Sequence, residues 1–430
     1  MDLTPLKVSR DYRTLIGGQL VSSLGVQLTA VAVPFQVYAM TRSSLYVGLV
    51  SLAQLIPLII GSLWGGTLVD AMDRRKLLII EEIIAAVMTA GLALNADLLH
   101  SLWPLFVFPA ATAALGGIDS SARNAMIPNL VGLQLIPASN ALFQSLFQMG
   151  SIAGPAVAGL LLAGAGIKVV FWLNVATFLL SVVAVTIMSP QPPQGTTTRP
   201  GLRSVIDGFR FVRTSPQIQG AYLIDVNAMV FGLPRALFPA LAATTFGGGA
   251  TTVGLLYAAP GAGALIGAVT TGWVGRIRRQ GLAVIIAVIV WGAAITGFGL
   301  VPWLWVALPL LAIAGWADLI SAVFRNTIIQ FAGPDEMRGR LMGVQVAVVT
   351  GGPRLGDLEA GAVATAFGDT ASIVSGGLAC ILGALLVARA LPGFRHQKVA
   401  AQKVAAQAAA SPGTGSQADP ETGLEAAADA

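Results

Sequence analysis

Twelve apolar segments, each long enough to cross a bilayer as a helix, occupy most of this chain. A membrane-spanning helix needs about 20 predominantly apolar residues. Of the 430 residues, 55% are hydrophobic and only 10% are charged, with a mean hydropathy of +0.77. Soluble domains carry about 25% charged residues, because their surface must be polar. The composition therefore predicts an all-α membrane protein, and it excludes a soluble enzyme, a disordered chain and a nucleic-acid-binding domain.

The expected spans follow one another with mostly short polar connections. The first apolar segment is longer than the core of a cleavable signal peptide, and it leads into a second span. We therefore expect the first segment to remain as a transmembrane helix. The twelve spans are expected at residues 12–39, 44–69, 77–96, 102–124, 138–165, 169–188, 216–245, 252–274, 281–301, 303–330, 341–366 and 371–391.

The lysines and arginines are distributed unevenly between the two sides of the predicted bundle. With the N-terminus placed in the cytoplasm, 21 of the 25 basic residues fall on the cytoplasmic side. Arg42 and Lys168 fall outside, and Arg235 and Arg354 fall within spans. Cytoplasmic loops of membrane proteins are enriched in Lys and Arg. We therefore expect a multi-pass protein of the bacterial cytoplasmic membrane with both termini in the cytoplasm.

One long polar connection divides the spans into six and six. The expected organisation is a first six-helix bundle at 1–188, a cytoplasmic linker at 189–215, a second bundle at 216–391 and a disordered cytoplasmic tail at 392–430. Apolar residues recur at helical spacing in the second half of the linker. This pattern predicts an amphipathic helix, which either lies on the membrane surface or docks on the bundle. Its apolar residues are Leu202, Val205, Ile206, Phe209 and Val212.

The two sets of six spans resemble each other in sequence. TyrValGlyLeuVal at 46–50 corresponds to ThrValGlyLeuLeu at 252–256. An acidic residue followed by ArgAsn occurs in span four (Asp119, Arg123) and again in span ten (Asp318, Arg325). Because both matches share an offset of about 205 residues, they indicate an internal duplication. Two pseudo-symmetric six-helix bundles with a site between them are typical of secondary transporters.

The loop after span two carries the first of three motifs that resemble the major facilitator superfamily. This loop, GlyThrLeuValAspAlaMetAspArgArgLys at 66–76, is similar to the superfamily's loop signature. The resemblance implies that Asp70 and Arg74 or Arg75 close the cytoplasmic side against the start of span eleven. Anchoring by positive charge is the alternative. The matching positions are Gly66, Asp70, Asp73, Arg74 and Arg75, and in the second copy Gly275 replaces the acid.

Two further motifs indicate export. Gly150, Gly154, Pro155 and Gly159 in span five resemble the antiporter signature, although Ala141 stands where its first glycine is usual. The loop at 334–340, which contains Arg338 and Arg340, is similar to that of the enterobactin exporter subfamily. The resemblance to the superfamily covers nearly all of residues 10–391. It implies a transporter that exports a siderophore or a related metabolite by alternating access.

Charged residues inside the spans are candidates for gating. An ionised side chain at the bilayer centre costs roughly 2.5–3.5 kcal/mol on insertion scales, so each needs a partner, water or a proton. Asp119 and Arg123 are four residues apart on one helix face and can pair locally. The alternative is an exchange across the halves, Asp119 with Arg325 and Arg123 with Asp318. Asp318 and Arg325 are too far apart along their own helix for direct contact.

Carboxylic acids inside the spans are candidates for proton coupling, because desolvation favours their uncharged form. Asp225 lies near the middle of span seven, and Glu359 has no obvious partner. Asp357, a third candidate, is three residues from Arg354, and we expect these two side chains to neutralise each other. The alternative for each acid is a water-exposed residue without a coupling role.

Polar groups within the spans are expected to line a substrate cavity. Arg235 and Arg354 would suit an anionic or catecholate substrate by charge and cation–π contact. The uncharged candidates are Gln19, Gln27, Gln144, Gln148 and Asn227. We expect no cofactor and no metal site, and the chain has no phosphate-binding GxxxxGK[ST] loop and no HExxH motif.

We therefore predict a proton-coupled antiporter, monomeric and embedded in the lipid bilayer, that binds a small molecule and no nucleic acid. A multidrug exporter of amphiphilic compounds is the main alternative, since such cavities look alike in sequence. A lipid flippase or a non-transporting receptor on the same fold is a third class.

Overall fold

The computed structural model describes residues 3–192, 210–272, 277–334 and 337–396. Eleven helical segments in these ranges are long and apolar enough to cross a membrane. The expected twelfth, α15 (Arg338–Phe367), is as long as the others at 30 residues, but Arg354, Asp357 and Glu359 lie within it. The all-helical prediction is therefore confirmed, and the span that fails the hydropathy test is the one that carries a cluster of charges.

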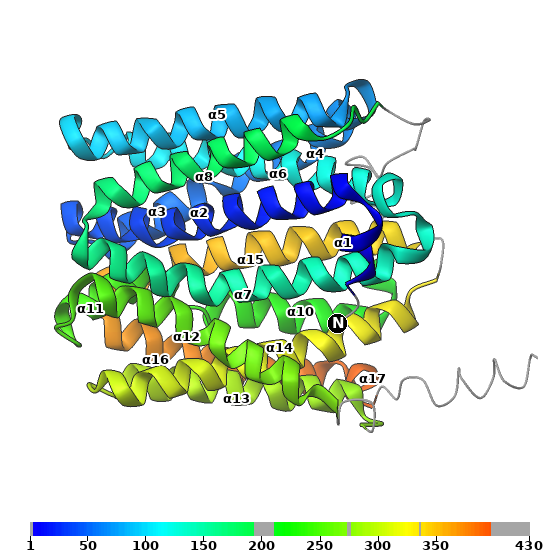
Figure 1. Ribbon diagram of the computed structural model, residues 1–430. Helices are drawn as coiled ribbons and strands as arrows, with labels where there is room; N and C mark the ends of the chain where they lie inside the picture. Colours follow the sequence, from blue (N-terminus) through cyan, green and yellow to red (C-terminus); the bar gives the residue numbers. More distant parts are fainter. Residues whose placement is uncertain (1–2, 193–209, 273–276, 335–336, 397–430) are drawn as a thin grey trace, which may run out of the picture.

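The helices of the first half form one side of the bundle in Figure 1. Their bounds agree with the predicted spans to within three residues, apart from a break in span two at Gln54 and a longer fourth span that ends at Val131 instead of 124. They are α1 (Thr4–Val8), α2 (Arg10–Thr41), α3 (Ser44–Ala53), α4 (Leu55–Ala71), α5 (Arg74–Leu94), the π-helical turn η1 (Asn95–Leu99), α6 (Pro104–Val131), η2 (Leu133–Leu135), α7 (Ile136–Gly164) and α8 (Ile167–Ile187).

The helices of the second half form the other side, and α7 and α15 lie along the border between the two (Figure 1). Figure 1 also shows α1 and the last short helix, α17, at the same end of the bundle. We call this end the termini end and the opposite end the far end. The helices are α10 (Pro216–Phe231), η3 (Arg235–Leu237), α11 (Phe238–Thr244), α12 (Gly249–Thr270), α13 (Gln280–Leu300), α14 (Leu304–Ala332), α15 (Arg338–Phe367), α16 (Asp369–Ala390) and α17 (Pro392–Arg395).

The two halves repeat the same small-residue packing. In the first half, the backbone of α4 at Gly61 contacts the backbone of α6 at Ala114. In the second half, α12 at Gly263 contacts α14 at Ala312 in the same way. Glycine allows such close approach of helices in lipid, where packing replaces the hydrophobic effect as the driving force. The internal duplication predicted from sequence is thus present in the packing.

Span seven is not a continuous helix. Its first part, α10, ends at Phe231, and the chain resumes as η3 and α11 after Pro234. A broken helix leaves backbone groups without partners, which neighbouring helices must satisfy inside a membrane. Trp291 of α13 donates its indole N–H to the carbonyl oxygen of Gly232 at 2.8 Å. This hydrogen bond from α13 therefore stabilises the break in span seven.

The linker and the tail are described only in part. Residues 193–209 and 397–430 lie outside the described residues, and so does most of the predicted amphipathic helix. At the described end of the linker, Val212 is buried against Ile218, Tyr222 and Leu341, so this end docks on the second half. The ordered chain also extends beyond residue 391, because Phe394 of α17 is fully buried.

Candidate functional site

A hydrogen bond between the two halves lies toward the far end of the bundle, two to three turns from the start of α3 and the end of α15. Asp357 of α15 accepts a hydrogen bond at 2.5 Å from the hydroxyl of Ser51 on α3, in the other half. Its second carboxylate oxygen accepts the backbone N–H of Ala236 in η3 at 3.1 Å. Asp357 thus joins α3 to the exposed backbone of the broken span seven. We call Ser51, Asp357 and Ala236 the far-end latch.

The helices around the far-end latch approach each other closely. The backbone of α3 at Gly48 contacts the carbonyl group of Asp357, leaving no room for a side chain at position 48. On the other side of the border, a Cβ on Gly159 of α7 would lie 2.8 Å from the Cα of Gly254 on α12. Two helices of each half therefore meet without intervening side chains at the far end, so that this end is closed.

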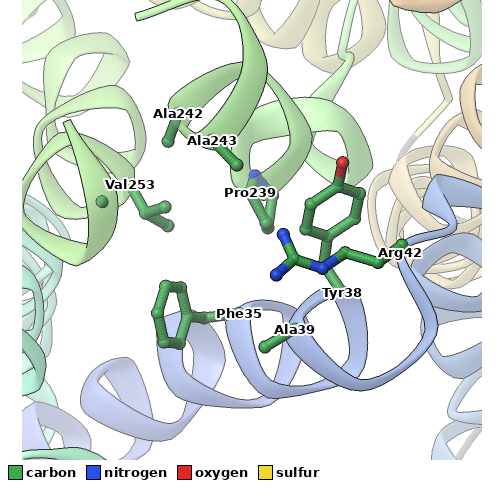
Figure 2. A pocket seen from close by; sticks show the side chains of 9 residues that line it. Phe35, Tyr38, Ala39, Arg42, Pro239, Ala242, Ala243 and Val253 are labelled. Atoms are coloured by element: carbon green, nitrogen blue, oxygen red, sulfur yellow. The ribbon is translucent and has the colours of Figure 1, made fainter. Parts of the chain in front are cut away.

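A small pocket opens between the halves at the same end. It has a volume of about 220 Å³ and lies between α2 of the first half and α11 and α12 of the second. Figure 2 shows the guanidinium of Arg42 beside Tyr38 and Pro239 in this pocket. Sites for drug-sized ligands have volumes of about 300–1,000 Å³. The far-end pocket is thus too small for such a molecule in this conformation.

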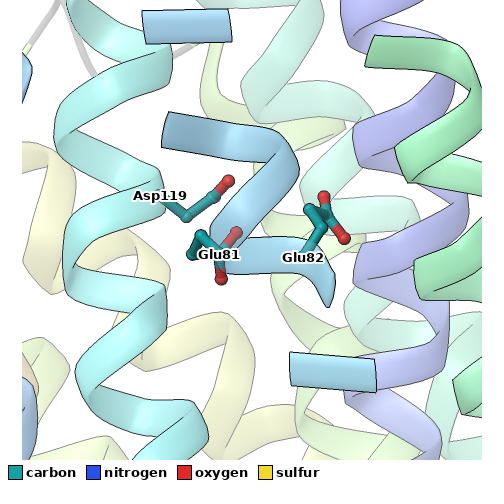
Figure 3. Close-up of side chains that lie close together, drawn as sticks. All are labelled: Glu81, Glu82 and Asp119. Atoms are coloured by element: carbon teal, nitrogen blue, oxygen red, sulfur yellow. The ribbon is translucent and has the colours of Figure 1, made fainter. Parts of the chain in front are cut away.

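A buried charge cluster lies in the first half. Arg123 of α6 contacts Asp119 on its own helix, with Nε 2.5 Å from Oδ1. Its Nη2 lies 2.6 Å from Oε1 of Glu82 on α5. The hydroxyl of Ser181 on α8 donates to the same oxygen of Glu82 at 2.6 Å. Glu81, next to Glu82, lies in the same group, and the three carboxylates have ligand oxygens within 4.8 Å of one another (Figure 3).

The second half contains a corresponding arginine. Nη2 of Arg325 on α14 lies 2.8 Å from Oδ1 of Asp225 on α10. The N–H bonds of Arg325 do not point along this line, so the contact is an ion pair without an aligned hydrogen bond. Nη1 of Arg325 donates to Ser321 at 2.7 Å. Asp318 lies one turn before Ser321 and two turns before Arg325 on α14. One of its buried carboxylate oxygens has no hydrogen bond.

The predicted exchange of charges across the halves is not formed in this structure. Arg123 and Arg325 each pair within their own half, as the local alternative for Asp119 and Arg123 predicted. Four-residue spacing places Asp119 and Arg123 on one face of α6, so the contact needs no movement of the halves.

The sequence reasoning missed Glu81 and Glu82. Both are buried, with 6% and 2% of their surface exposed. The signal was present, because these two acids stand alone in the apolar run LeuLeuIleIleGluGluIleIleAlaAla of span three. Two adjacent carboxylates inside a span are unfavourable without partners, so their position in this run indicates candidate functional residues.

Arg354 and Asp357, which we expect to neutralise each other, make their direct hydrogen bonds to other groups. The carboxylate of Asp357 is held by Ser51 and Ala236, while Nη1 of Arg354 donates to the carbonyl oxygen of Thr350 at 2.8 Å. Residues three apart lie on one helix face, but the donors offered by α3 and η3 decide where the carboxylate points. Glu359 is half-buried and makes no hydrogen bond or ion pair with the described residues.

The residues of the loop motif have different surroundings. Asp73 accepts the N–H groups of Arg75 and of Gln191, at 2.9 and 3.1 Å. The guanidinium of Arg75 donates to the carbonyl oxygens of Val185 and Thr186 at the end of α8. Asp73 and Arg75 therefore tie the start of α5 to the end of α8 within the first half, which argues against a cross-half gate role for Arg75.

The remaining gate candidates stay predictions. Asp70 is the penultimate residue of α4, and Arg74 is buried beside the start of the linker. Arg340 has a contact with the sulfur of Met337 at 3.4 Å. The side chain of Arg338 lies outside the described residues, and Gly66 lies on α4.

The glycines of the antiporter motif face two different helices. A Cβ on Gly154 would lie 2.5 Å from the Cβ of Gln27 on α2, whereas Gly159 meets α12 of the other half. The carbonyl oxygen of Pro155 also faces Gly254. A Cβ on Gly150 would meet no atom closer than 3.9 Å. Through this motif α7 contacts α2 of its own half and α12 of the other half.

One cavity candidate makes a contact between helices. The side chain of Asn227 donates to the carbonyl oxygen of Cys380 at 2.8 Å and joins α10 to α16, and its place in a cavity stays a prediction. Arg235 and Gln144 are exposed, and Arg354 is half-buried. Gln19, Gln27 and Gln148 are half-buried on the adjacent helices α2 and α7, and their place in a cavity stays a prediction.

Comparison with known proteins places the chain in a family. The family described as transmembrane secretion effector matches residues 2–416. The chain belongs to this family. It is 28% identical over 397 residues to the enterobactin exporter EntS of Escherichia coli, covering 92% of this chain and 95% of that protein. It is 29% identical over 389 residues to EntS of Shigella boydii, covering 90% of this chain and 93% of that protein.

Solved transporter structures share the fold. A bacterial homologue of the human lysosomal transporter Spinster superposes with a TM-score of 0.69 at 15% identity, covering 90% of this chain and 98% of that one. A bacterial homologue of the iron transporter ferroportin gives 0.65 at 16% identity, covering 92% and 100%. These structures show the major facilitator fold, and the family match identifies the chain as a multi-pass membrane transporter and not an enzyme.

Proposed function

We propose that this protein is a proton-driven exporter that works by alternating access. The observation that carries this proposal is the hydrogen bond from Ser51 to Asp357. It joins the two halves at the far end through a carboxylate, whose charge depends on proton binding. Opening of the far end must break this bond.

Proton binding and opening are linked by the chemistry of this bond. A hydrogen bond to an ionised acceptor is roughly twice as strong as one between neutral groups. The ionised Asp357 therefore holds the far end closed, and a proton on Asp357 removes the charge that strengthens the bond. The far end thus opens more readily when protons are abundant on its side of the membrane.

Glu359 and Asp225 are the proposed carriers of the transported proton. Glu359 lies two residues after Asp357 on α15 and has no partner among the described residues, so it is free to exchange a proton. Asp225 is paired with Arg325, and its release would require Arg325 to be neutralised by another group such as Asp318. This difference favours Glu359 as the carrier.

A siderophore or related metabolite is the proposed substrate. Support comes from the EntS relatives, which are enterobactin exporters and match nearly the full chain. Arg235 is exposed at the break in span seven, beside the far-end latch, and Arg354 lies one turn from Asp357. Such cations would attract a catecholate by charge and by cation–π contact. Amphiphilic drugs are the alternative substrate class.

The proposed orientation puts the termini end in the cytoplasm of a bacterial inner membrane, with the protein acting as a monomer. The basic residues at the start of α2 and of α5 gather at this end, as the positive-inside rule requires. The far-end latch would then face the periplasm, where a proton gradient supplies protons.

Everted membrane vesicles test this proposal. The vesicles would come from cells that lack their own siderophore and drug exporters. Respiration would generate a pH gradient across the vesicle membrane, and enterobactin or ethidium would then be added. The proposal predicts gradient-dependent accumulation of enterobactin, which collapses when an uncoupler is added. Accumulation of ethidium alone would assign the drug class instead.

Substitutions of Glu359 and Asp225 test the two proposed proton carriers in the same vesicles. Glu359→Gln should abolish gradient-driven accumulation while enterobactin still equilibrates across the membrane, because only the coupling is lost. Asn227→Ala is the matched control, since Asn227 is half-buried in a contact between α10 and α16 and should leave coupling intact. Unchanged gradient dependence in both Glu359→Gln and Asp225→Asn would contradict the assignment of the carriers.

A further inference from the structure

The first half contains one more carboxylate than its arginine can pair. Arg123 makes ion pairs with Glu82 and Asp119, at 2.6 and 2.5 Å. Glu82 also accepts the hydroxyl of Ser181. Glu81 accepts no hydrogen bond and makes no ion pair among the described residues, although only 6% of its surface is exposed and one of its oxygens is fully covered. Its charge is therefore without a direct partner.

The second half indicates that this extra acid is not needed for folding. Arg325 has Asp225 as its partner and Asp318 nearby, so two acids accompany one arginine. The corresponding third span of that half, α13, contains no acidic residue along its whole length. Two acids are thus sufficient to hold a buried arginine in this fold, and Glu81 is additional.

We propose that Glu81 and its neighbours Glu82, Asp119 and Arg123 form a proton-binding site in the first half, with the proton on Glu81. Three ionised carboxylates around one guanidinium would leave a large uncompensated negative charge in a buried site, which is strongly unfavourable. A proton on Glu81 removes the one charge that has no direct partner. This site is separate from the latch residue Asp357 and from Asp225 in the second half.

A proton fits this site better than a metal ion. The carboxylates could supply three oxygen ligands, since their ligand atoms lie within 4.8 Å of one another. However, Arg123 already occupies the space between Glu82 and Asp119, and its positive charge would repel a cation. The charged groups that surround Glu81 are Glu82 on its own helix and Asp119 and Arg123 on α6, while α8 contributes the neutral Ser181. Figure 3 shows the carboxylates of Glu81 and Asp119 close to each other.

The presence of the proton can be measured without transport. A protonated carboxyl group has a carbonyl stretching band in the infrared that an ionised carboxylate lacks, and the band shifts in heavy water. The purified full chain in lipid nanodiscs at pH 7 should show such a band, and Glu81→Gln should remove part of it. Asp97→Asn is the control, because Asp97 pairs with Lys168 outside the cluster and should leave the band unchanged. Glu81→Asp, which keeps the carboxyl group, should retain it.

Two outcomes would overturn the proposal. If the band is the same in the native chain and in a folded Glu81→Gln variant, Glu81 is ionised. If Mg²⁺, Mn²⁺ or Zn²⁺ shifts the carboxylate bands of the native chain but not those of Glu81→Gln, the cluster holds a cation instead.

The claim that this proton is exchanged during transport rests on the proposed function. In everted vesicles, Glu81→Gln should lose gradient-driven enterobactin accumulation at least tenfold. If the native protein itself ignores the gradient, the proposed function fails, whereas the infrared result still decides the proton on Glu81. If the native protein follows the gradient and Glu81→Gln does so equally, the exchange of this proton is refuted.

Discussion

Replacing Ser51 by alanine should open the far end of the transporter. The change removes the hydrogen bond from Ser51 to Asp357 but leaves Asp357 its bond from the backbone of Ala236. Hydrogen bonds to charged groups contribute roughly 1.5–3 kcal/mol. Because the remaining donor still satisfies part of the carboxylate, we take the lower value, about 1.5 kcal/mol.

This energy predicts a measurable shift in population. A difference of about 1.4 kcal/mol changes an equilibrium constant tenfold. A far-open state that is populated at about 1% in the native protein would therefore rise to about 10% in Ser51→Ala. Since the glycine contacts at Gly48 and Gly159 remain, the closed state should still dominate.

Spin labels on the two halves can measure this shift. Met40 in the first half and Thr245 in the second are exposed at the far end, and their cysteine variants would be labelled for distance measurement. The only native cysteine, Cys380, is fully buried and should escape labelling. Ser51→Ala should increase the long-distance population between the labels.

A matched serine on the same span provides the control. Ser62 donates to the carbonyl oxygen of Leu58 on its own helix at 2.8 Å, so Ser62→Ala removes a hydrogen bond that does not cross the halves. Its distance distribution should equal that of the native chain. An unchanged distribution in Ser51→Ala, or an equal change in Ser62→Ala, would refute the far-end latch.

Three more predictions follow from the same contacts. Gly159→Leu should prevent closure of the far end and raise the long-distance population, because a Cβ at this position already lies 2.8 Å from Gly254; a native-like distribution would show that the contact is dispensable. Lowering the pH should raise the same population in the native chain but not in Asp357→Asn, where no charge is left to titrate, and an equal pH response in both would exclude Asp357 as the sensor. Asp225→Asn leaves Arg325 buried without its ion pair and should reduce stability by roughly 3–5 kcal/mol, visible as a lower thermal unfolding temperature; an unchanged temperature would mean that Asp318 takes over the pairing.

Hydropathy was sufficient to predict most of the spans, because the thickness of the bilayer fixes the length of each helix. The local pair of Asp119 and Arg123 was also predictable, since a spacing of four residues is a property of a single helix. The two halves were predictable as well, because two sequence matches share one offset. Each of these features depends on residues that are close in sequence or on a simple periodicity.

Contacts between helices distant in sequence were not predictable in this way. Ser51 and Asp357 are 306 residues apart, and their bond depends on how far each helix is rotated, which hydropathy does not determine. The break of span seven exposes the N–H of Ala236 and thereby draws Asp357 away from Arg354. The hydrogen bond from Asn227 to α16 was not predictable for the same reason, because the face of α10 that packs on α16 cannot be read from composition.

Reconstitution of the purified protein in liposomes tests the central claim most directly. A pH gradient would be imposed across the membrane with equal enterobactin on both sides, and proton flux and enterobactin flux would be recorded together. Proton-driven alternating access predicts that enterobactin accumulates on the acidic side and that protons move in the opposite direction, with both fluxes lost when the gradient is dissipated. Enterobactin that redistributes without a response to the gradient, or protons that flow at the same rate without enterobactin, would contradict it.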